Sequence, residues 1–287
     1  MYWIVTDSTI DMPKRYVDSR ENFRVLNMSY TMDGVSYVPD GTDENSREIY
    51  RQLRAGKNIV TAQVNSEAWR EAFEEILAGG DDLLVIAFSS GLSGTCQAAF
   101  TAAEELREQY PDRKIEVVDS LCASAGEGLL VDYALRNRDS GMSLEENAAW
   151  VRDNVQNIIH WFTVDDLMFL MRGGRVGAVS AYIGSLVKIK PILHVNEEGK
   201  LIPREKVQGR RKSIRALADK VKQNIVHPEG QLVLISHGDC EAEAQSLADM
   251  IKAELPVAEV RLSYIGPIVG AHSGPGTLAV FFIGRGR

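Results

Sequence analysis

Short apolar runs rich in β-branched and aromatic residues alternate along the chain with longer amphipathic segments. Six of these runs are predicted to be strands: residues 2–6, 83–88, 115–119, 158–164, 232–236 and 278–283. Helices are predicted at residues 66–78, 95–108, 143–156, 209–225 and 240–254. Because parallel strands are usually joined through a helix, this alternation predicts an α/β fold with mostly parallel sheets.

The length of the chain suggests two domains. At 287 residues it is long for one domain and suits two α/β domains of ordinary size. The strand pattern restarts near residue 158, after a predicted helix that opens with a capping box at residues 143–146. We therefore expect an N-terminal domain at residues 1–157 and a C-terminal domain at residues 158–287.

Charge and composition narrow the class of protein. The net charge of -8 argues against a nucleic acid partner, because phosphate binding needs a basic surface. No apolar run reaches the roughly 18 residues of a membrane-spanning helix, and the first residues, MYWIVTDST, show no secretory signal pattern. The three cysteines, Cys96, Cys122 and Cys240, lack the spacing of a metal or redox motif. These features predict a cytoplasmic protein without a metal site.

Hydroxyl-rich loops follow several predicted strands, which is where open α/β sheets bind their ligands. These loops are residues 6–9, 61–63, 89–95 and 119–120. Where such a loop opens a helix, the unpaired N–H groups and the helix dipole favour an anion. Gly91 and Gly94 also allow the backbone to approach a ligand closely. The loops therefore predict an anion site, although Ser and Thr are also ordinary helix caps.

A serine of the 89–95 loop could instead be a nucleophile, with His272 or His237 as its base. The residues around Ser93, Gly-Leu-Ser-Gly-Thr, do not form the G-x-S-x-G elbow of α/β-hydrolases. A serine hydrolase that acts on acyl esters through Ser93 and His272 stays an alternative. The chain has no G-x-x-x-x-G-K-[ST] phosphate loop and no second cluster with zinc-ligand spacing beside residues 237–240.

Residues 167–193 form a long, mostly apolar tract. Such a composition is typical of a core helix, or of the wall of an apolar ligand cavity. In the second case the candidate lining residues are Met168, Met171, Ile183, Leu186 and Ile192. Arg172 and Arg175 flank a glycine pair in this tract. Their guanidinium groups are either solvated loop charges or groups that bind a carboxylate or a phosphate.

A cationic cluster near residue 210 stands out in this acidic chain. Its members are Lys206, Arg210, Arg211 and Lys212. The cluster is either a solvated helix start or a docking face for an acidic partner or a transiently contacted anionic membrane surface.

In this order, the segments resemble those of the DegV family of bacterial fatty-acid-binding proteins. The resemblance covers nearly the whole chain, and these motifs carry it: Val5-Thr-Asp-Ser-Thr9, Thr61-Ala-Gln63, Ser89-Ser-Gly-Leu-Ser-Gly-Thr95, Val118-Asp-Ser120, Leu170-Met-Arg-Gly-Gly-Arg175, Ile183-Gly184, Ile189-Lys-Pro-Ile-Leu193, Lys206-Val207 and Ile265-Gly-Pro-Ile-Val-Gly-Ala-His-Ser-Gly-Pro-Gly276. The chain departs from the family pattern at Ala62, where Ser is usual, and at Ser273, where Thr is more common.

This resemblance implies two α/β domains that hold one long-chain fatty acid between them. It places the carboxylate of that acid at Thr61, Ser93 and His272. It also implies a carrier without catalysis of its own, which presents the carboxylate to a separate ATP-dependent kinase subunit for conversion to acyl-phosphate. Arg175 then serves phosphoryl transfer or docking of the kinase, and no cofactor is implied besides the bound lipid.

Overall fold

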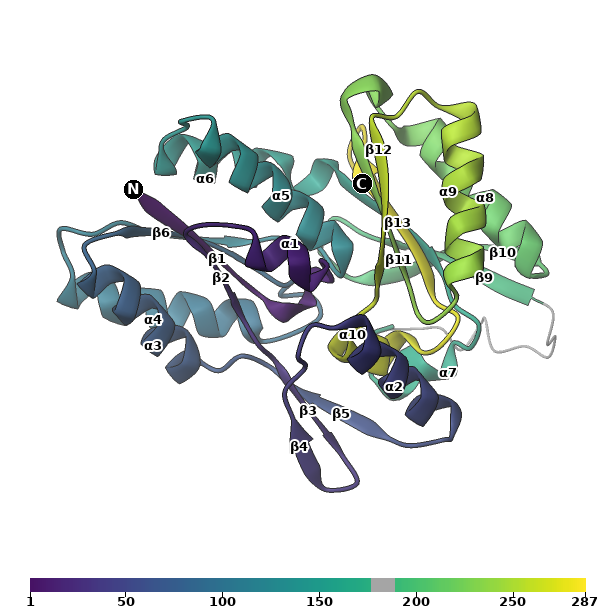
Figure 1. Ribbon diagram of the computed structural model, residues 1–287, viewed down its shortest axis with the longest axis horizontal. Coiled ribbons are helices and arrows are strands. Elements are labelled where there is room, and N and C mark those ends of the chain that lie inside the picture. Colours follow the sequence, from purple (N-terminus) through teal and green to yellow (C-terminus); the bar gives the residue numbers. More distant parts are fainter. Residues whose placement is uncertain (177–188) are drawn as a thin grey trace.

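The computed structural model describes residues 1–176 and 189–287, and their strands form three sheets (Figure 1). A parallel sheet has the order β2-β1-β6-β7, with β1 (Tyr2–Asp7), β2 (Phe23–Leu26), β6 (Asp82–Ala87) and β7 (Ile115–Asp119). A small antiparallel sheet, β4-β3-β5, contains β3 (Ser29–Met32), β4 (Val35–Tyr37) and β5 (Ile59–Ala62). The largest sheet, β10-β9-β8-β13-β11-β12, contains β8 (Ile158–Thr163), β9 (Ile189–Val195), β10 (Leu201–Gln208), β11 (Leu232–His237), β12 (Glu259–Tyr264) and β13 (Leu278–Ile283).

Helices cover both faces of the parallel sheet and the outer face of the largest sheet. On the parallel sheet, α3 (Ser66–Ala78) and α4 (Thr95–Gln109) pack on one face, and α5 (Ala125–Asp139) and α6 (Leu144–Asn154) on the other. On the largest sheet, α8 (Arg210–Asn224) and α9 (Glu241–Glu254) form the outer layer. The shorter elements are η1 (Ser8–Ile10), α1 (Lys14–Asp18), α2 (Asp43–Arg54), η2 (Val155–Asn157), α7 (Met168–Arg172), η4 (Pro228–Gly230) and α10 (Pro267–Ser273).

Helix α5 lies between the parallel sheet and the largest sheet and is buried on almost every side (Figure 1). Its apolar residues pack in one core with residues of β1 on one side and β13 on the other. Two glycines permit this close packing: a Cβ at Gly126 would overlap His160 Nε2, and a Cβ at Gly128 would lie 2.5 Å from Ile10 O. The N-terminal and C-terminal halves of the chain therefore share a continuous core.

The predicted α/β class is confirmed, and each predicted strand and helix is present to within a few residues. The capping box also forms, because Ser143 Oγ accepts from Glu146 N–H while the Glu146 carboxylate accepts from Ser143 N–H. Within the residues described, no helix is both long and apolar enough to cross a membrane.

Strand direction in the largest sheet corrects the expectation of mostly parallel sheets. Only β11 and β12 run parallel there, whereas the four other pairings are antiparallel. The last strand, β13, lies between β8 and β11 and is antiparallel to both. Apolar runs predict strands but carry no signal for which strands become neighbours, so this direction could not be inferred from them.

The apolar tract of residues 167–193 is not one core helix. Helix α7 ends at Arg172, and Gly174 follows it with a left-handed φ of 67°. The tract resumes as β9, while residues 177–188 lie outside the described part of the chain.

Candidate functional site

A cavity of about 190 Å³ lies between the two halves of the chain. Most of its wall is apolar: Phe88 and Leu92 come from the loop after β6, Phe162 and Phe281 from β8 and β13, and Ile268 from α10. Both halves therefore contribute to the wall. A cavity with such a lining suits a hydrocarbon chain.

Five residues that the sequence singled out line this cavity together: Thr61, Ser93, Gly94, Arg175 and His272. Thr61 Oγ1 on β5 lies 2.8 Å from His272 Nε2 on α10, within hydrogen-bond distance. Ser93 Oγ lies 3.0 Å from the hydroxyl of the first residue of α4 and accepts a hydrogen bond from its N–H at 3.3 Å. The cavity wall thus holds a group of hydroxyl, imidazole and guanidinium donors that can receive an anion.

The imidazole of His272 is neutral in the unliganded protein. Burial, with the Arg175 guanidinium nearby, lowers the pKa of His272 to about 4. A Cβ at Gly173 would overlap His272 Nδ1, so the glycine lets the end of α7 pack against the ring. A carboxylate bound next to His272 would favour the protonated ring and shift its pKa upward again.

Arg175 carries a charge that no carboxylate of the described residues balances. Its Nε donates to Leu92 O at 3.3 Å, and its Nη1 donates to Gly173 O. The side chain borders the apolar cavity and also a second, more polar chamber of about 200 Å³, which Lys57 and Arg172 line as well. Thr61, Arg175 and His272 form part of both walls, so they separate an apolar space from a cationic one.

Ser273 adds a hydroxyl to the cavity that was not among the predicted ligand contacts. It follows His272 on α10, is 5% exposed, and its Oγ has no hydrogen-bond partner within the part of the chain described. Such a buried, unpaired hydroxyl is unfavourable until a ligand or water accepts from it. Ser273 directly follows His272 in the 265–276 motif, and this adjacency was the available signal for it.

The loop that carries Ser93 is held from the opposite half of the chain. Ser89 Oγ donates to Gly199 O at 2.9 Å, in the turn between β9 and β10. A Cβ at Gly91 would lie 2.6 Å from Glu198 O, so the two backbones approach closely only because residue 91 is glycine. Gly94 is similarly confined, because a Cβ there would overlap the Gln63 carboxamide. The 88–94 loop is therefore shaped before any ligand arrives.

The hydroxyl-rich loop of residues 6–9 supports that loop and, like residues 119–120, does not line the cavity. Asp7 is fully buried, and its carboxylate accepts from Phe88 N–H at 2.9 Å and Thr9 N–H at 3.1 Å. Thr9 Oγ1 lies 2.6 Å from Asp7 Oδ1 and 2.8 Å from Glu127 Oε2. Burial raises the pKa of both carboxyl groups, and the neighbouring Asp7 raises the pKa of Glu127 further.

Asp11 connects the cavity wall to the start of α10. Its carboxyl group accepts from Ser124 Oγ, and Ser124 lines the cavity. The same group accepts from Gly266 N–H at 2.8 Å, at the N-cap of α10. Burial raises the pKa of Asp11 to about 7.

Replacing Asp11 with asparagine is expected to flatten the pH dependence of stability between about pH 5.5 and 6.5. Across this interval the folded protein, with its raised Asp11 pKa, holds a proton that the unfolded chain has released, so stability falls as pH rises. Asparagine cannot ionise and loses this contribution. Urea unfolding of both proteins at both pH values should show a relative change of about 1 kcal/mol in the free energy of unfolding. The same pH dependence in both proteins would contradict the raised pKa.

The apolar candidates of the 167–193 tract that the structure describes do not line the cavity, whereas Arg175 of the same tract does. Met168 is 42% exposed and Met171 packs at the edge of the shared core, and neither lines the cavity. Ile192 packs against α8, and Val195 of the same strand lines the cavity in its place. The two side chains differ because alternate residues of β9 point to opposite faces of the sheet. Two further candidates, Ile183 and Leu186, lie outside the described residues.

The geometry does not form a serine hydrolase pair. Within the described residues, Ser93 has no hydrogen bond to His272; the imidazole lies against the Thr61 hydroxyl instead. His237, the other candidate base, is 2% exposed, packs beside Tyr264 and does not line the cavity. The described ranges also contain no group of three or more potential metal ligands.

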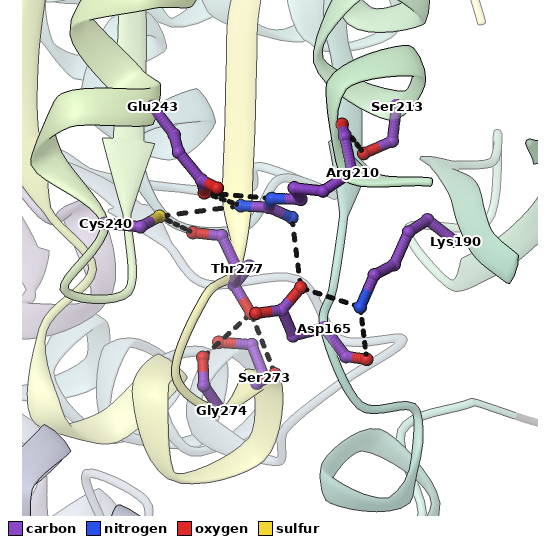
Figure 2. Close-up of polar contacts among 9 residues, drawn as sticks. All are labelled: Asp165, Lys190, Arg210, Ser213, Cys240, Glu243, Ser273, Gly274 and Thr277. Carbon is purple, nitrogen blue, oxygen red and sulfur yellow. Dashed lines mark hydrogen bonds and ion pairs between the residues drawn. The ribbon is translucent and has the colours of Figure 1, made fainter. Parts of the chain in front are cut away.

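The cationic cluster near residue 210 is not a continuous exposed face. Arg210 points inward, where it donates to the Glu243 carboxylate at 2.9 Å and 2.5 Å (Figure 2). Arg211 and Lys212 stay exposed at the start of α8.

The fold and this cavity define an α/β protein with a buried apolar pocket whose wall carries an anion-binding group of side chains. The sequence matches, over residues 2–285, the family described as uncharacterised protein, DegV family. The chain belongs to the DegV family, as the resemblance of its motifs indicated. It is 43% identical over 282 residues to a DegV domain-containing protein of Clostridium perfringens, covering 98% of this chain and 97% of that protein.

Two solved structures of the family are similar over almost their full length. A DegV family protein from Thermus thermophilus, described for its fatty acid binding, has a TM-score of 0.89 and 28% identity, with 99% of each chain covered. A DegV lipid-binding protein from Thermotoga maritima has a TM-score of 0.87 and 28% identity, with 100% of each chain covered.

Proposed function

We propose that this protein binds one long-chain fatty acid, with the hydrocarbon tail in the apolar cavity and the carboxylate at Thr61, Ser93, Gly94 and His272. The observation that carries the proposal is the juxtaposition of a mostly apolar cavity wall with hydroxyl and imidazole donors. Fatty acid and lipid binding by similar members of the family supports it. The halves 1–157 and 158–287 are proposed as the two domains that enclose the ligand.

The energetics of a long-chain acid fit this arrangement. Burying about 16 methylenes at ~0.8 kcal/mol each gives a gross gain of roughly 13 kcal/mol, which is offset by the translational and conformational freedom lost on binding. The carboxylate needs charge-assisted hydrogen bonds once it leaves water. Thr61, Ser93 and the unpaired Ser273 hydroxyl can donate them.

Solvent extraction and native mass spectrometry of the purified protein test this proposal. We expect one long-chain fatty acid per chain, either retained from the host or bound when palmitic or oleic acid is added. A protein that neither retains nor binds either acid would contradict the proposal. Turnover of a chromogenic acyl ester by the isolated chain, abolished in Ser93→Ala, would favour the hydrolase alternative.

We further propose that the protein has no catalysis of its own and presents the carboxylate to a separate ATP-dependent kinase subunit in the cytoplasm, which forms the acyl-phosphate. The cationic chamber beside the proposed carboxylate position supports this role, because Lys57, Arg172 and Arg175 line it and none of its described lining residues is acidic. Positive groups placed there can stabilise the charge of a transferring phosphoryl group.

Arg175→Ala is expected to separate binding from phosphorylation. Its guanidinium donates only to backbone carbonyls in the unliganded protein, so we expect fatty acid affinity to change less than threefold. Acyl-phosphate formation with the fatty acid kinase of the same organism should fall by about tenfold or more, because a charged group facing the phosphoryl group is lost. Arg211→Ala, an exposed cation on α8, is the control. A fall in affinity equal to the fall in phosphorylation would instead assign Arg175 to the carboxylate site.

A further inference from the structure

A network of ion pairs surrounds Asp165, two residues beyond the end of β8 (Figure 2). Lys190 on β9 lies 2.9 Å from Asp165 Oδ1 and also donates to Asp165 O at 3.1 Å. Arg210 Nη1 on α8 lies 3.7 Å from the same carboxylate oxygen and is fixed in turn by Glu243 on α9. The side chains of Lys190 and Arg210 are 16% and 17% exposed, so both cations are largely buried between the largest sheet and its helical layer, whereas the Asp165 side chain is 48% exposed.

The carboxylate of Asp165 packs against the loop that ends α10. A Cβ at Gly276 would overlap Asp165 Oδ2, and Gly276 has a left-handed φ of 76°. The next residue, Thr277, places its Oγ1 2.8 Å from Ser273 O and 2.9 Å from Gly274 O, the last carbonyls of α10 (Figure 2). Because the final turn of a helix lacks internal partners for its carbonyls, this contact fixes the turn that carries His272.

Asp165 also begins the connection that leads into α7. A Cβ at Gly274 would overlap the ring of Phe169 on α7. A Cβ at Gly173, directly after α7, would overlap His272 Nδ1. Two segments that touch the His272 region are therefore tied to Asp165: the 274–277 loop contacts its carboxylate, and α7 begins three residues after it in the chain. That carboxylate pairs with Lys190 of β9 and Arg210 of α8, which belong to the largest sheet and its outer helical layer.

We propose that Asp165 is a positioning residue for His272: the ion pairs of Asp165 with Lys190 and Arg210 set the place of α7 and of the 274–277 loop, and so orient the imidazole toward Thr61. The effect on a ligand rests on the proposed binding of a fatty acid carboxylate at this site. The orientation of the ring does not rest on it.

Asp165→Asn is the suitable substitution, because Arg210 keeps its pair with Glu243. Lys190 loses its ion pair but keeps its hydrogen bond to the backbone carbonyl of residue 165. Asp18→Asn is the matched control: Asp18 pairs with Lys14 at 2.9 Å on the surface of α1, the same N···O distance as in the Lys190–Asp165 pair. We expect Asp165→Asn to weaken oleic acid binding by about tenfold and Asp18→Asn to leave it unchanged. Asp165→Glu, which retains the charge, should recover part of the loss.

A double-mutant cycle separates positioning from a general structural effect. In the His272→Ala background, Asp165→Asn should weaken binding less than twofold, because no imidazole remains to be oriented. A tenfold loss in both backgrounds, or in neither, would overturn the proposal.

The ring can also be observed without any ligand. Among the five histidines of the chain, the imidazole NMR signal of His272 is identified by its absence in His272→Ala. Asp165→Asn should shift or broaden this signal and raise the titration midpoint of the ring from about 4 toward 6.5, whereas Asp18→Asn should not. If the wild-type protein bound no fatty acid, the proposed function would fail, but this NMR measurement would still test the role of Asp165. An unchanged His272 signal and titration midpoint in Asp165→Asn would overturn the positioning role of Asp165.

Discussion

Asp7→Asn is expected to lower the free energy of unfolding by about 3 kcal/mol, whereas Glu127→Gln should change it by less than about 1 kcal/mol. The two carboxyl groups share the Thr9 hydroxyl, and although burial raises the pKa of both, their hydrogen bonds favour different protonation states. Asp7 accepts from Phe88 N–H and Thr9 N–H in addition to that hydroxyl, so its hydrogen bonds favour the charged form.

Glu127 is the carboxyl group that holds the proton. A hydroxyl has only one hydrogen, and Thr9 Oγ1 lies within 2.8 Å of both Asp7 and Glu127. When Thr9 donates to ionised Asp7, the Glu127 contact requires that Glu127 donate to Thr9. Burial and the Asp7 charge, which raise the pKa of Glu127 well above its usual range, favour this arrangement.

The side chains of the two variants differ in what they can accept. A glutamine at position 127 donates to Thr9 through its amide nitrogen, as the protonated carboxyl does. An asparagine at position 7 has one oxygen for three donors, so its NH₂ group faces an N–H group of Phe88 or Thr9. A buried donor left without an acceptor costs about 1–3 kcal/mol, and the lost charge adds to this.

Urea unfolding at about pH 7 measures both effects, and retention of fatty acid measures the consequence for the loop that carries Ser93. We expect the asparagine variant to lose ligand as well as stability, since Phe88 N–H begins that loop. Equal destabilisation by both substitutions would contradict the assignment of the proton to Glu127.

Local patterns in the sequence predict the structural features that are set by residues close to one another in the chain, such as helix caps and helix spans. The loop of residues 89–95 follows a strand and opens a helix, and this context alone placed Ser93 and Gly94 at a helix N-terminus. The capping box of α6 and the spans of α3 and α4 were predictable for the same reason, because caps and amphipathic periods involve residues close in sequence.

Features set by long-range packing were not predictable in this way. Helix α5 is buried between two sheets over most of its length, so its sequence lacks the amphipathic period that reveals a helix. Ile192 was chosen for its apolar character, but the phase of β9 decides which residues face the cavity, and that phase follows from strand pairing. The contact between Thr61 and His272 joins residues 211 positions apart, and only the order of motifs shared with the DegV family linked them.

Thr61→Ala and Ser93→Ala are each expected to weaken fatty acid binding by roughly 5- to 150-fold, which corresponds to about 1–3 kcal/mol for a buried acceptor that loses a donor. Isothermal titration with oleic acid, or competition with a fluorescent fatty acid, measures the change. Thr61→Ser and Ser93→Thr are the matched controls, because each keeps a hydroxyl at its position and should retain most of the affinity.

The combination of variants distinguishes the two hydroxyl groups. Thr61 lies 2.8 Å from His272 and acts with the imidazole as one unit, so Thr61→Ala and His272→Ala together should cost less than the sum of the single losses. Ser93 hydrogen-bonds within its own loop and has no contact with either residue among the described hydrogen bonds. Its loss should therefore add in free energy to that of Thr61, giving a combined effect of about 25-fold or more. Unchanged affinity in both single variants would contradict the placement of the carboxylate at this end of the cavity. Additive losses for Thr61→Ala and His272→Ala would show that the imidazole binds the ligand independently of the threonine that it contacts.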